Sequence, residues 1–201
     1  KLESEIRQVG NPECPRTLIR LMNSGETLAD SCLARKGMYT GENARFMRAW
    51  HEVGVGRIFN SDPAWELYAN GGGYRKWYGC LDDVVLWDDN GAEIRSFVDG
   101  TGRPRAGAFN IDFIGRDGAF WTAISNYEFS ARYLPSRVLF SSASNAIFAE
   151  RISTPAMLAS LNSRVSGYVL KSVNPTLNNN AGDIAKAPSP NRVVSNAVEN
   201  I

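Results

Sequence analysis

Short β-prone runs, separated by turns that contain glycine, occupy the chain from residue 36 to about residue 141. Runs of this length, bounded by glycine, asparagine and aspartate, are typical of strands rather than helices. The segments DDNG (88–91) and GRDG (115–118) favour tight turns of the hairpin type. The pattern therefore predicts a sheet-rich chain, with strands at 46–53, 57–59, 83–87, 93–98, 119–124 and 137–141.

One helical pattern follows the β-prone region. Thr154 is a good N-cap, and Pro155 suits the first helical position. The helix should end near Val173, because Pro175 disfavours helical backbone at the residue before it. Apolar residues at helical spacing predict the face that packs in the core, which is Leu158, Leu161 and Val165.

The N-terminal part is expected to add a short helix at 26–33, with Leu28 and Cys32 on one face. The polar residues at both ends predict a lead-in segment (1–25), one domain (26–190) and a polar tail (191–201). Together these features predict an α+β fold, in which a mixed or antiparallel sheet packs against the late helix.

Charge and cysteine content narrow the function classes. The 201 residues carry a net charge of only +1, but arginine supplies most of the cations. A near-neutral chain can still bind DNA when its arginines gather on one surface. Cys14, Cys32 and Cys80 match no zinc spacing and are expected to be reduced thiols. No signal peptide or long apolar run is visible, so we expect a soluble cytoplasmic chain.

Three motifs hint at enzymes, and each has a simpler structural explanation. EVGVG (52–56) and DPAW (62–65) resemble the cofactor loop and Asp-Pro-Pro-Trp motif of amino-group methyltransferases, but they lie too close together. Asp89 and Glu93 resemble a nuclease metal site, yet a turn accounts for the acidic cluster. His51, the only histidine, has no cysteine or second histidine near it in the sequence. We therefore predict no catalytic residues and no metal site.

Four blocks carry a resemblance to a known family, in the family's order. The blocks are KGMYTGENARFMRAWHEV (36–53), GGGYRKWYG (71–79) with DDVVLW, FSARYLPSRVLF (129–140) and MLASLNSRVSGYVLKSVNPTLNNNAGDIAKAP (157–188). Together they resemble the C-terminal part of the adenine-specific DNA methyltransferases of BREX phage-defence systems, the PglX family. More distantly they resemble target-recognition domains of Type I and Type IIG restriction-modification systems. The Asn-Pro-Pro-Tyr motif and the cofactor loop of the family are missing.

The resemblance implies a target-recognition-domain-like fold whose cations and aromatics contact double-stranded DNA. Arginine and lysine neutralise phosphates and contact guanine, and aromatics contact or wedge against bases. For Trp77 and Tyr78, packing in the core is an equal alternative, because a strand points alternate residues inward. For Arg103 and Arg105, a merely solvated loop is an equal alternative. The candidate DNA-binding residues are Arg75, Lys76, Trp77, Tyr78, Arg45, Arg48, Arg35, Lys36, Arg103 and Arg105.

The sequence thus favours a DNA target-recognition module that transfers no methyl group by itself and needs no cofactor. The resemblance implies a parent enzyme that binds S-adenosylmethionine in another domain and methylates adenine. A second hypothesis is a protein-interaction module that docks a methyltransferase core or another defence-system subunit. A third is a small S-adenosylmethionine-dependent methyltransferase or a nuclease.

Overall fold

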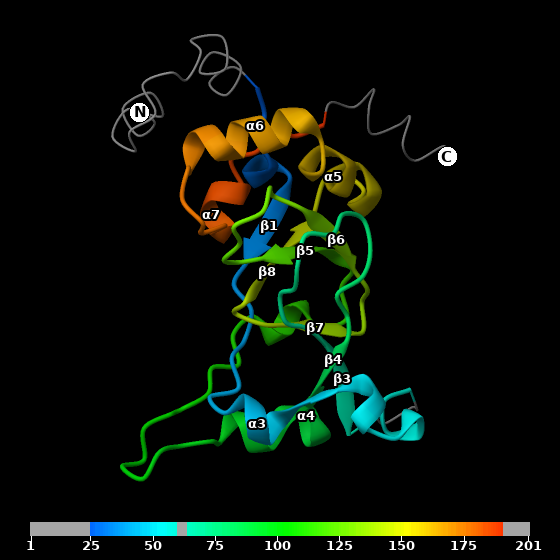
Figure 1. The fold of residues 1–201 in the computed structure, drawn as a ribbon, viewed down its shortest axis with the longest axis vertical. Helices are drawn as coiled ribbons and strands as arrows, with labels where there is room; N and C mark the ends of the chain where they lie inside the picture. The colour runs from blue at the N-terminus through cyan, green and yellow to red at the C-terminus, as the bar shows by residue number, and fades with distance from the viewer. Residues whose placement is uncertain (1–24, 60–63, 191–201) are drawn as a thin grey trace.

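Two four-stranded sheets lie one above the other along the long axis of the molecule (Figure 1). The computed structural model describes residues 25–59 and 64–190. Sheet I is wholly antiparallel, and sheet II has one parallel pair, β3 with β7. Sheet I has the order β1 (Cys32–Arg35), β8 (Ser144–Ala149), β5 (Gly118–Thr122) and β6 (Ala131–Leu134). Sheet II has the order β2 (Met47–Ala49), β4 (Asp83–Leu86), β3 (Trp65–Ala69) and β7 (Val138–Phe140).

Helices gather at the two ends of the molecule (Figure 1). The group beside sheet I is α5 (Thr154–Leu161), α6 (Arg164–Val173) and α7 (Ala181–Ile184). The group beside sheet II is α3 (Asn43–Phe46) and α4 (Asp88–Arg95). Short 3-10 turns complete the described secondary structure: η1 (Leu28–Asp30), η2 (Trp50–Glu52), η3 (Val55–Arg57) and η4 (Ile111–Phe113). The prediction of an α+β fold with mixed and antiparallel sheets is confirmed.

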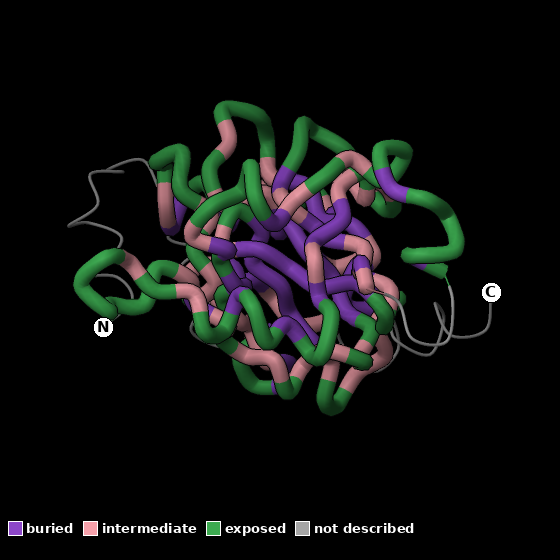
Figure 2. The backbone as a smooth tube through the Cα atoms, turned by 90° about the horizontal axis from the view of Figure 1, so that it is seen from below, coloured by how far each residue is buried: buried purple, intermediate pink, exposed green. Residues whose placement is uncertain are grey.

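Sheet I buries both of its faces, so its strands carry almost continuous apolar residues. Side chains alternate between the two faces of a strand. Ala119 and Trp121 therefore pack in the cluster that α5 and α6 cover, whereas Phe120 packs in a cluster with Ala69 and Phe140 of sheet II. The second cluster joins the two sheets. Buried residues accordingly run through the middle of the molecule, with exposed loops around them (Figure 2).

The strand predictions are partly correct. The expected strands at 83–87, 119–124 and 137–141 correspond to β4, β5 and β7, and 46–53 contains the shorter β2. The expected strands at 57–59 and 93–98 are wrong. Residue 57 ends the 3-10 turn η3, and residues 93–95 belong to α4. The strands β1, β3, β6 and β8 were not predicted.

Neither predicted hairpin turn joins two neighbouring strands. In DDNG, Asp89, Asn90 and Gly91 adopt the left-handed backbone that the motif favours, with φ of 47°, 53° and 70°. These three residues lie within the bounds of α4 and interrupt its regular helical backbone, so the turn follows β4 without joining it to a partner strand. In GRDG, Gly115 has φ of 94°, and the segment connects η4 to β5. Both motifs thus contain the left-handed residues expected of a tight turn, but neither turn joins the two strands of a hairpin.

The late helix is two helices. Ser153 caps α5, because its hydroxyl accepts a hydrogen bond from the Ala156 N–H at 3.4 Å, so Thr154 is the first helical residue. A break at Asn162 ends α5, and α6 then runs to Val173, where the pattern predicted the end. The break shifts the helical phase. As a result Val165, expected in the core, is 53% exposed, whereas Leu158 and Leu161 are buried.

The expected N-terminal helix at 26–33 is wrong as well. One 3-10 turn, η1, leads directly into β1. Leu28 and Cys32 are nevertheless buried in the same cluster. The expected tail (191–201) and nearly all of the expected lead-in (1–25) lie outside the described residues, so the domain boundaries stay a prediction. No helix within residues 25–59 and 64–190 has the length and apolar character to cross a membrane.

Candidate nucleic-acid interface

The glycine-rich segment 71–79, called the glycine loop below, runs along the outer edge of sheet I. The Trp77 N–H donates to the Ala131 carbonyl at 3.0 Å, and the Tyr133 N–H donates to the Trp77 carbonyl at 2.8 Å. The loop thereby covers part of the unpaired edge of β6, which would otherwise be open to another chain. Gly72 is required here, because its φ is 121° and a Cβ would lie 2.8 Å from Cys80 Sγ.

A fully buried arginine, Arg132 of β6, holds the glycine loop from beneath. Its Nη1 donates to the Gly73 carbonyl at 3.1 Å, and its Nη2 donates to Thr122 Oγ1 at 2.9 Å. Thr122 Oγ1 in turn donates to the Gly72 carbonyl at 2.8 Å. The guanidinium lies 4.7 Å from the Phe120 ring centroid. Two adjacent loop carbonyls are therefore fixed by side chains of sheet I.

The charge of Arg132 has no carboxylate partner among the described residues. Nη1 lies 3.3 Å from Cys80 Sγ, and Nε has no hydrogen-bond partner. Burial lowers the pKa of Arg132, but a guanidinium stays protonated in proteins. Arg75 of the loop also makes no ion pair within residues 25–59 and 64–190. Arg75 and Arg132 thus carry positive charge that no ion pair neutralises among the residues that the structure describes.

The outer side of the glycine loop presents aromatic rings to solvent. Trp77 is 53% exposed and Tyr78 is 63% exposed, so packing in the core is excluded for both. Trp77 has φ of 76°, a left-handed conformation that is strained for a bulky side chain. Such strain persists where surrounding contacts impose it, as the two hydrogen bonds to β6 do here, and it is common at binding sites.

Lys76 has a different environment from Arg75. Its Nζ donates to the Asn162 carbonyl at 3.0 Å, at the break between α5 and α6, and the side chain is half-buried. Asn162 also clamps β6, since its Oδ1 accepts from the Ala131 N–H at 3.0 Å and its Nδ2 donates to the Ala131 carbonyl at 2.9 Å. Lys76 therefore ties the glycine loop to the helices in addition to carrying charge.

A second group of candidate residues lies at the far end, beside sheet II. Arg45 forms an ion pair with Glu93, and its guanidinium lies 5.0 Å from the Phe97 ring centroid. Arg105 lies 5.2 Å from the same ring centroid. The nearest carboxylate oxygen to Arg105, from Glu42, is 4.0 Å away. These two arginines are exposed but partly neutralised.

Of the remaining candidates, two lie beside sheet II and two at the end of β1 in sheet I. Arg48 is exposed and donates to the Ala44 carbonyl at 2.7 Å. Arg35 ends β1 and lies 4.8 Å from the Phe113 ring centroid, and Lys36 next to it is exposed. Arg103 is exposed near the tip of a hairpin that follows α4. The ten predicted residues therefore lie in separate places, at the glycine loop, beside sheet II and at the end of β1, rather than in one patch.

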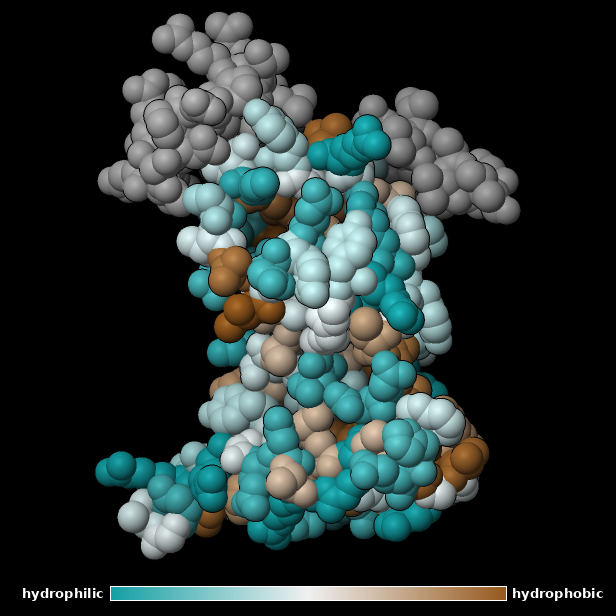
Figure 3. All heavy atoms as spheres, in the orientation of Figure 1, coloured by the Kyte–Doolittle hydropathy of each residue, from teal (hydrophilic) through white to brown (hydrophobic). Residues whose placement is uncertain are grey.

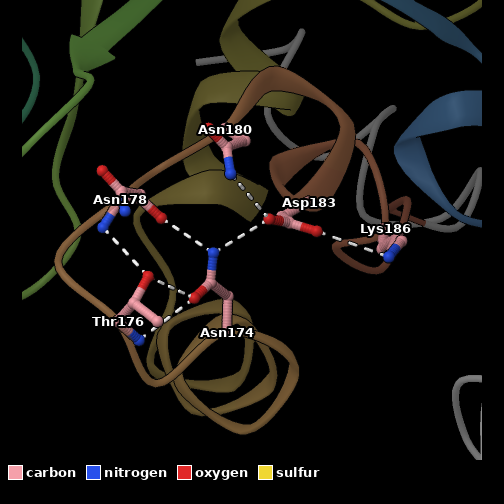
Figure 4. Close-up of polar contacts among 6 residues, drawn as sticks. All are labelled: Asn174, Thr176, Asn178, Asn180, Asp183 and Lys186. Carbon is pink, nitrogen blue, oxygen red and sulfur yellow. Dashed lines mark hydrogen bonds and ion pairs between the residues drawn. The ribbon is translucent and has the colours of Figure 1, made fainter. Parts of the chain in front are cut away.

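The asparagine-rich segment after α6 satisfies its own polar groups (Figure 4). Asn174 Oδ1 accepts from the Thr176 N–H at 3.0 Å and from Thr176 Oγ1 at 2.6 Å. Asn174 Nδ2 donates to the Asn178 carbonyl and to Asp183 Oδ2, both at 2.9 Å. Asp183 Oδ1 lies 3.4 Å from Lys186 Nζ. This network fixes the connection from α6 to α7.

The enzyme-like motifs have structural roles where the structure describes them. Glu52 accepts a hydrogen bond from the Ala49 N–H at 2.7 Å and caps η2, and Glu93 is paired with Arg45. His51 is exposed beside Trp50. Asp62 lies outside the described residues. No group of three or more potential metal-ligating side chains occurs within residues 25–59 and 64–190.

Sequence reasoning missed the residues that hold the glycine loop. Arg132, Thr122 and Asn162 were not selected, although Arg132 and Asn162 lie inside blocks that carried the resemblance. A usable signal was the single arginine of the apolar run ARYL (131–134), because an arginine inside a buried strand needs several acceptors. The three acceptors of Arg132, which are the Gly73 carbonyl, Cys80 Sγ and Thr122 Oγ1, lie 10 to 59 residues away in the sequence, so no local pattern reveals them.

Comparisons with known proteins agree on one group of enzymes. The chain is 39% identical over 178 residues to the adenine-specific methyltransferase PglX of Lacticaseibacillus casei (strain Zhang), an alignment that covers 84% of this chain and 15% of that protein. It is 30% identical over 196 residues to the adenine-specific methyltransferase BrxX of Escherichia coli O9:H4 (strain HS), covering 93% of this chain and 16% of that protein. No family model matches the chain.

A solved structure shares the fold. It is the Type IIL restriction-modification enzyme MmeI in complex with DNA, with a TM-score of 0.52 and 13% identity. The similarity covers 87% of this chain and 25% of that enzyme, so in MmeI this fold makes up only one part of a larger chain. The chain is thus a homologue of a segment of the adenine-specific methyltransferases PglX and BrxX.

Proposed function

We propose that the chain is the DNA target-recognition part of an adenine-specific methyltransferase of a BREX or restriction-modification system. The observation that carries the proposal is the identity to a segment of PglX and BrxX over most of this chain. The shared fold with part of MmeI, an enzyme solved in complex with DNA, supports it. In this proposal the chain acts in the cytoplasm and transfers no methyl group alone. The rest of the enzyme would bind S-adenosylmethionine and methylate adenine.

The geometry supports a division of roles among the predicted DNA-binding residues. Arg75, Lys76, Trp77 and Tyr78 would contact the DNA backbone and neighbouring bases from the glycine loop. Arg75 suits a phosphate best, because it is exposed and lacks an acidic partner among the described residues. The second contact region would comprise Arg45, Arg48, Arg35, Lys36, Arg103 and Arg105.

The test is DNA binding of the chain to pooled random duplexes over a series of salt concentrations. We expect affinity to fall with salt, with a log–log slope of about 0.9 per phosphate contacted. Arg75→Ala combined with Lys76→Ala should lower that slope by about one to two. Arg164→Ala, an exposed arginine at the start of α6, is the matched control and should leave the slope unchanged. Absence of salt-sensitive binding by the unmodified chain would refute the proposal.

A docking role for the same chain is the second candidate, and one observation favours it. Trp50, Val55 and Phe59 are exposed apolar residues within one short stretch beside sheet II. Exposed apolar residues that gather in one place often mark a protein interface. This stretch would bind the methyltransferase core or another defence-system subunit. Copurification with such a core in the absence of DNA, lost on Trp50→Ser with Phe59→Ser, would favour docking over DNA recognition.

A further inference from the structure

Residues 97–107 form a two-stranded hairpin, called the finger below, that projects from the sheet II end of the molecule (Figure 1). The Arg105 N–H donates to the Phe97 carbonyl at 2.9 Å, and the Asp99 N–H donates to the Arg103 carbonyl at 2.8 Å. Val98 and Pro104 are paired between these two bonds. The finger therefore has a paired backbone along its length.

The tip of the finger is ordered by one carboxylate. Asp99 Oδ1 accepts from the Thr101 N–H at 2.8 Å, from Thr101 Oγ1 at 2.6 Å and from the Arg103 N–H at 3.0 Å. Space is open beside both glycines of the tip, since a Cβ added at Gly100 or Gly102 would meet no atom of the described residues within 4 Å. Figure 3 shows the projection as a mostly hydrophilic surface, free on the visible side.

The base of the finger is held by aromatic and cationic contacts. The Phe97 ring packs against Phe46, at 5.2 Å between centroids, and against the guanidinium groups of Arg45 and Arg105. Gly107 exchanges two backbone hydrogen bonds with Tyr39, of 3.0 and 2.9 Å. Arg105 is thus fixed at the base, where it supports Phe97. Arg103, close to the tip, makes no ion pair in the described parts of the chain.

We propose that the finger enters the major groove of the target DNA and that Arg103 contacts a guanine there. This inference rests on the function proposed above. The major groove is about 12 Å wide and admits a two-stranded ribbon, and arginine forms a bidentate pair with the O6 and N7 atoms of guanine. The hairpin is ordered, and Arg103 near its tip is exposed and makes no ion pair within residues 25–59 and 64–190, so the finger has the shape and chemistry for this contact. Arg105 is a positioning residue, because its guanidinium is already packed on Phe97.

The finger projects from the sheet II end of the molecule, whereas the glycine loop lies along the edge of sheet I, so their contributions can be separated (Figure 1). Glycine-loop cations that contact phosphates would set affinity and its salt dependence without regard to sequence. A finger that contacts base edges would set the sequence selected. The two surfaces therefore make different predictions for the same binding experiment.

The test is selection of bound duplexes from a random pool, with the unmodified chain, Arg103→Lys, Arg103→Ala and the matched control Arg95→Ala. Lysine keeps the charge but loses the bidentate geometry. We expect Arg103→Lys to keep the salt dependence but to lose the guanine preference at one position, by roughly 5- to 150-fold. Arg103→Ala should lose the same preference, and Arg95→Ala should select the original motif.

Two failures are distinguishable in this experiment. If the unmodified chain shows no salt-sensitive DNA binding, the proposed function and the finger inference both fail. If it selects a motif that Arg103→Lys and Arg103→Ala select equally well, the function stands and the finger inference is overturned. Phe97→Leu tests the positioning role of the finger base, because it should weaken the guanine preference at the same motif position although Arg103 is unchanged.

Discussion

At the scale of single residues, burial separates the two cysteines that the structure describes. Cys32 is buried in the cluster beneath α5, and burial raises its pKa to about 11 from an ordinary 9.0. We expect native Cys32 to resist iodoacetamide at pH 8, because the thiolate is the reactive species. Half-buried Cys80 should react first. Mass spectrometry of the alkylated native chain checks the order, and rapid labelling of Cys32 before unfolding would contradict it.

The same shift makes stability depend on pH. Because the folded pKa of Cys32 lies above the unfolded pKa, its contribution to stability is complete below about pH 9 and is lost as pH rises toward 11. The free energy of unfolding from urea titrations should therefore fall over this window. Cys32→Ala is the control, since it should lower stability at every pH but remove this part of the slope.

The exposed residues of the glycine loop were easier to predict from the sequence than the buried residues that support the loop. Arg75, Trp77 and Tyr78 were found because cations and aromatics beside several glycines make a poor core, and the structure exposes all three. Arg132 was not found. Its role depends on the Gly73 carbonyl and on Thr122 Oγ1, and the Gly73 carbonyl reaches Arg132 only after the loop folds over sheet I. Long-range backbone partners of this kind leave no local pattern.

At the scale of elements, Asn162 decides how the late helical region packs. Its side chain bonds to both the N–H and the carbonyl of Ala131, and it stands at the break that separates α5 from α6. Asn162→Ala leaves the buried Ala131 N–H without this acceptor, which should cost about 1–3 kcal/mol of stability. Urea unfolding measures the loss. The exposed control Asn126→Ala should stay within about 0.5 kcal/mol, and an equal loss in both variants would count against the clamp.

The finger should lose part of the order at its tip at low pH. Hydrogen bonds from Thr101, with a further one from Arg103, hold the pKa of Asp99 below its ordinary value of 3.8. A carboxyl whose folded pKa is lowered stabilises the turn above the unfolded pKa, and the effect is lost as pH falls through the folded pKa. NMR titration should show the Thr101 and Arg103 amide shifts moving together below about pH 4. In Asp99→Asn the Thr101 and Arg103 amide shifts should no longer change with pH in this range. If they titrated as in the unmodified chain, Asp99 would not be the group that controls them.

Helices and strands were predictable where the pattern of apolar residues was uninterrupted and the flanking residues marked a clear boundary. DDVVLW gave β4, and the residues before Pro175 gave the end of α6. The pattern failed at 93–98, where β-prone residues become helical because the left-handed turn at Asp89 to Gly91 redirects the chain. It also failed at Val165, because the break at Asn162 shifts which residues face the core. Tertiary contacts override local preference at both places.

At the scale of the whole molecule, the chain passes repeatedly between the two sheets. β1 belongs to sheet I, and β2 to β4 belong to sheet II. The chain then returns to sheet I for β5 and β6, adds β7 to sheet II and finally adds β8 to sheet I. The apolar cluster that joins the sheets takes Phe148 and Phe120 from sheet I and Ala69 and Phe140 from sheet II. Neither sheet can separate from the other without exposing this cluster. The finger and the glycine loop are consequently held on one framework, which is what two contacts with a single DNA duplex would require.

This arrangement predicts that the two sheets unfold as one cooperative unit. Phe148 is fully buried and packs against Phe113 and Phe140, at centroid distances of 4.8 and 5.6 Å. Phe148→Ala removes contacts that serve both sheets, so it should lower the free energy of unfolding by about 3–5 kcal/mol. Hydrogen exchange should accelerate equally at Val84 in sheet II and Ala146 in sheet I, because both amides would then exchange through the same global opening. Phe59→Ala, at an exposed site, is the control and should change neither rate appreciably. If exchange accelerated at Ala146 alone, the sheets would be separate units, and the fixed spacing between the finger and the glycine loop would lose its physical basis.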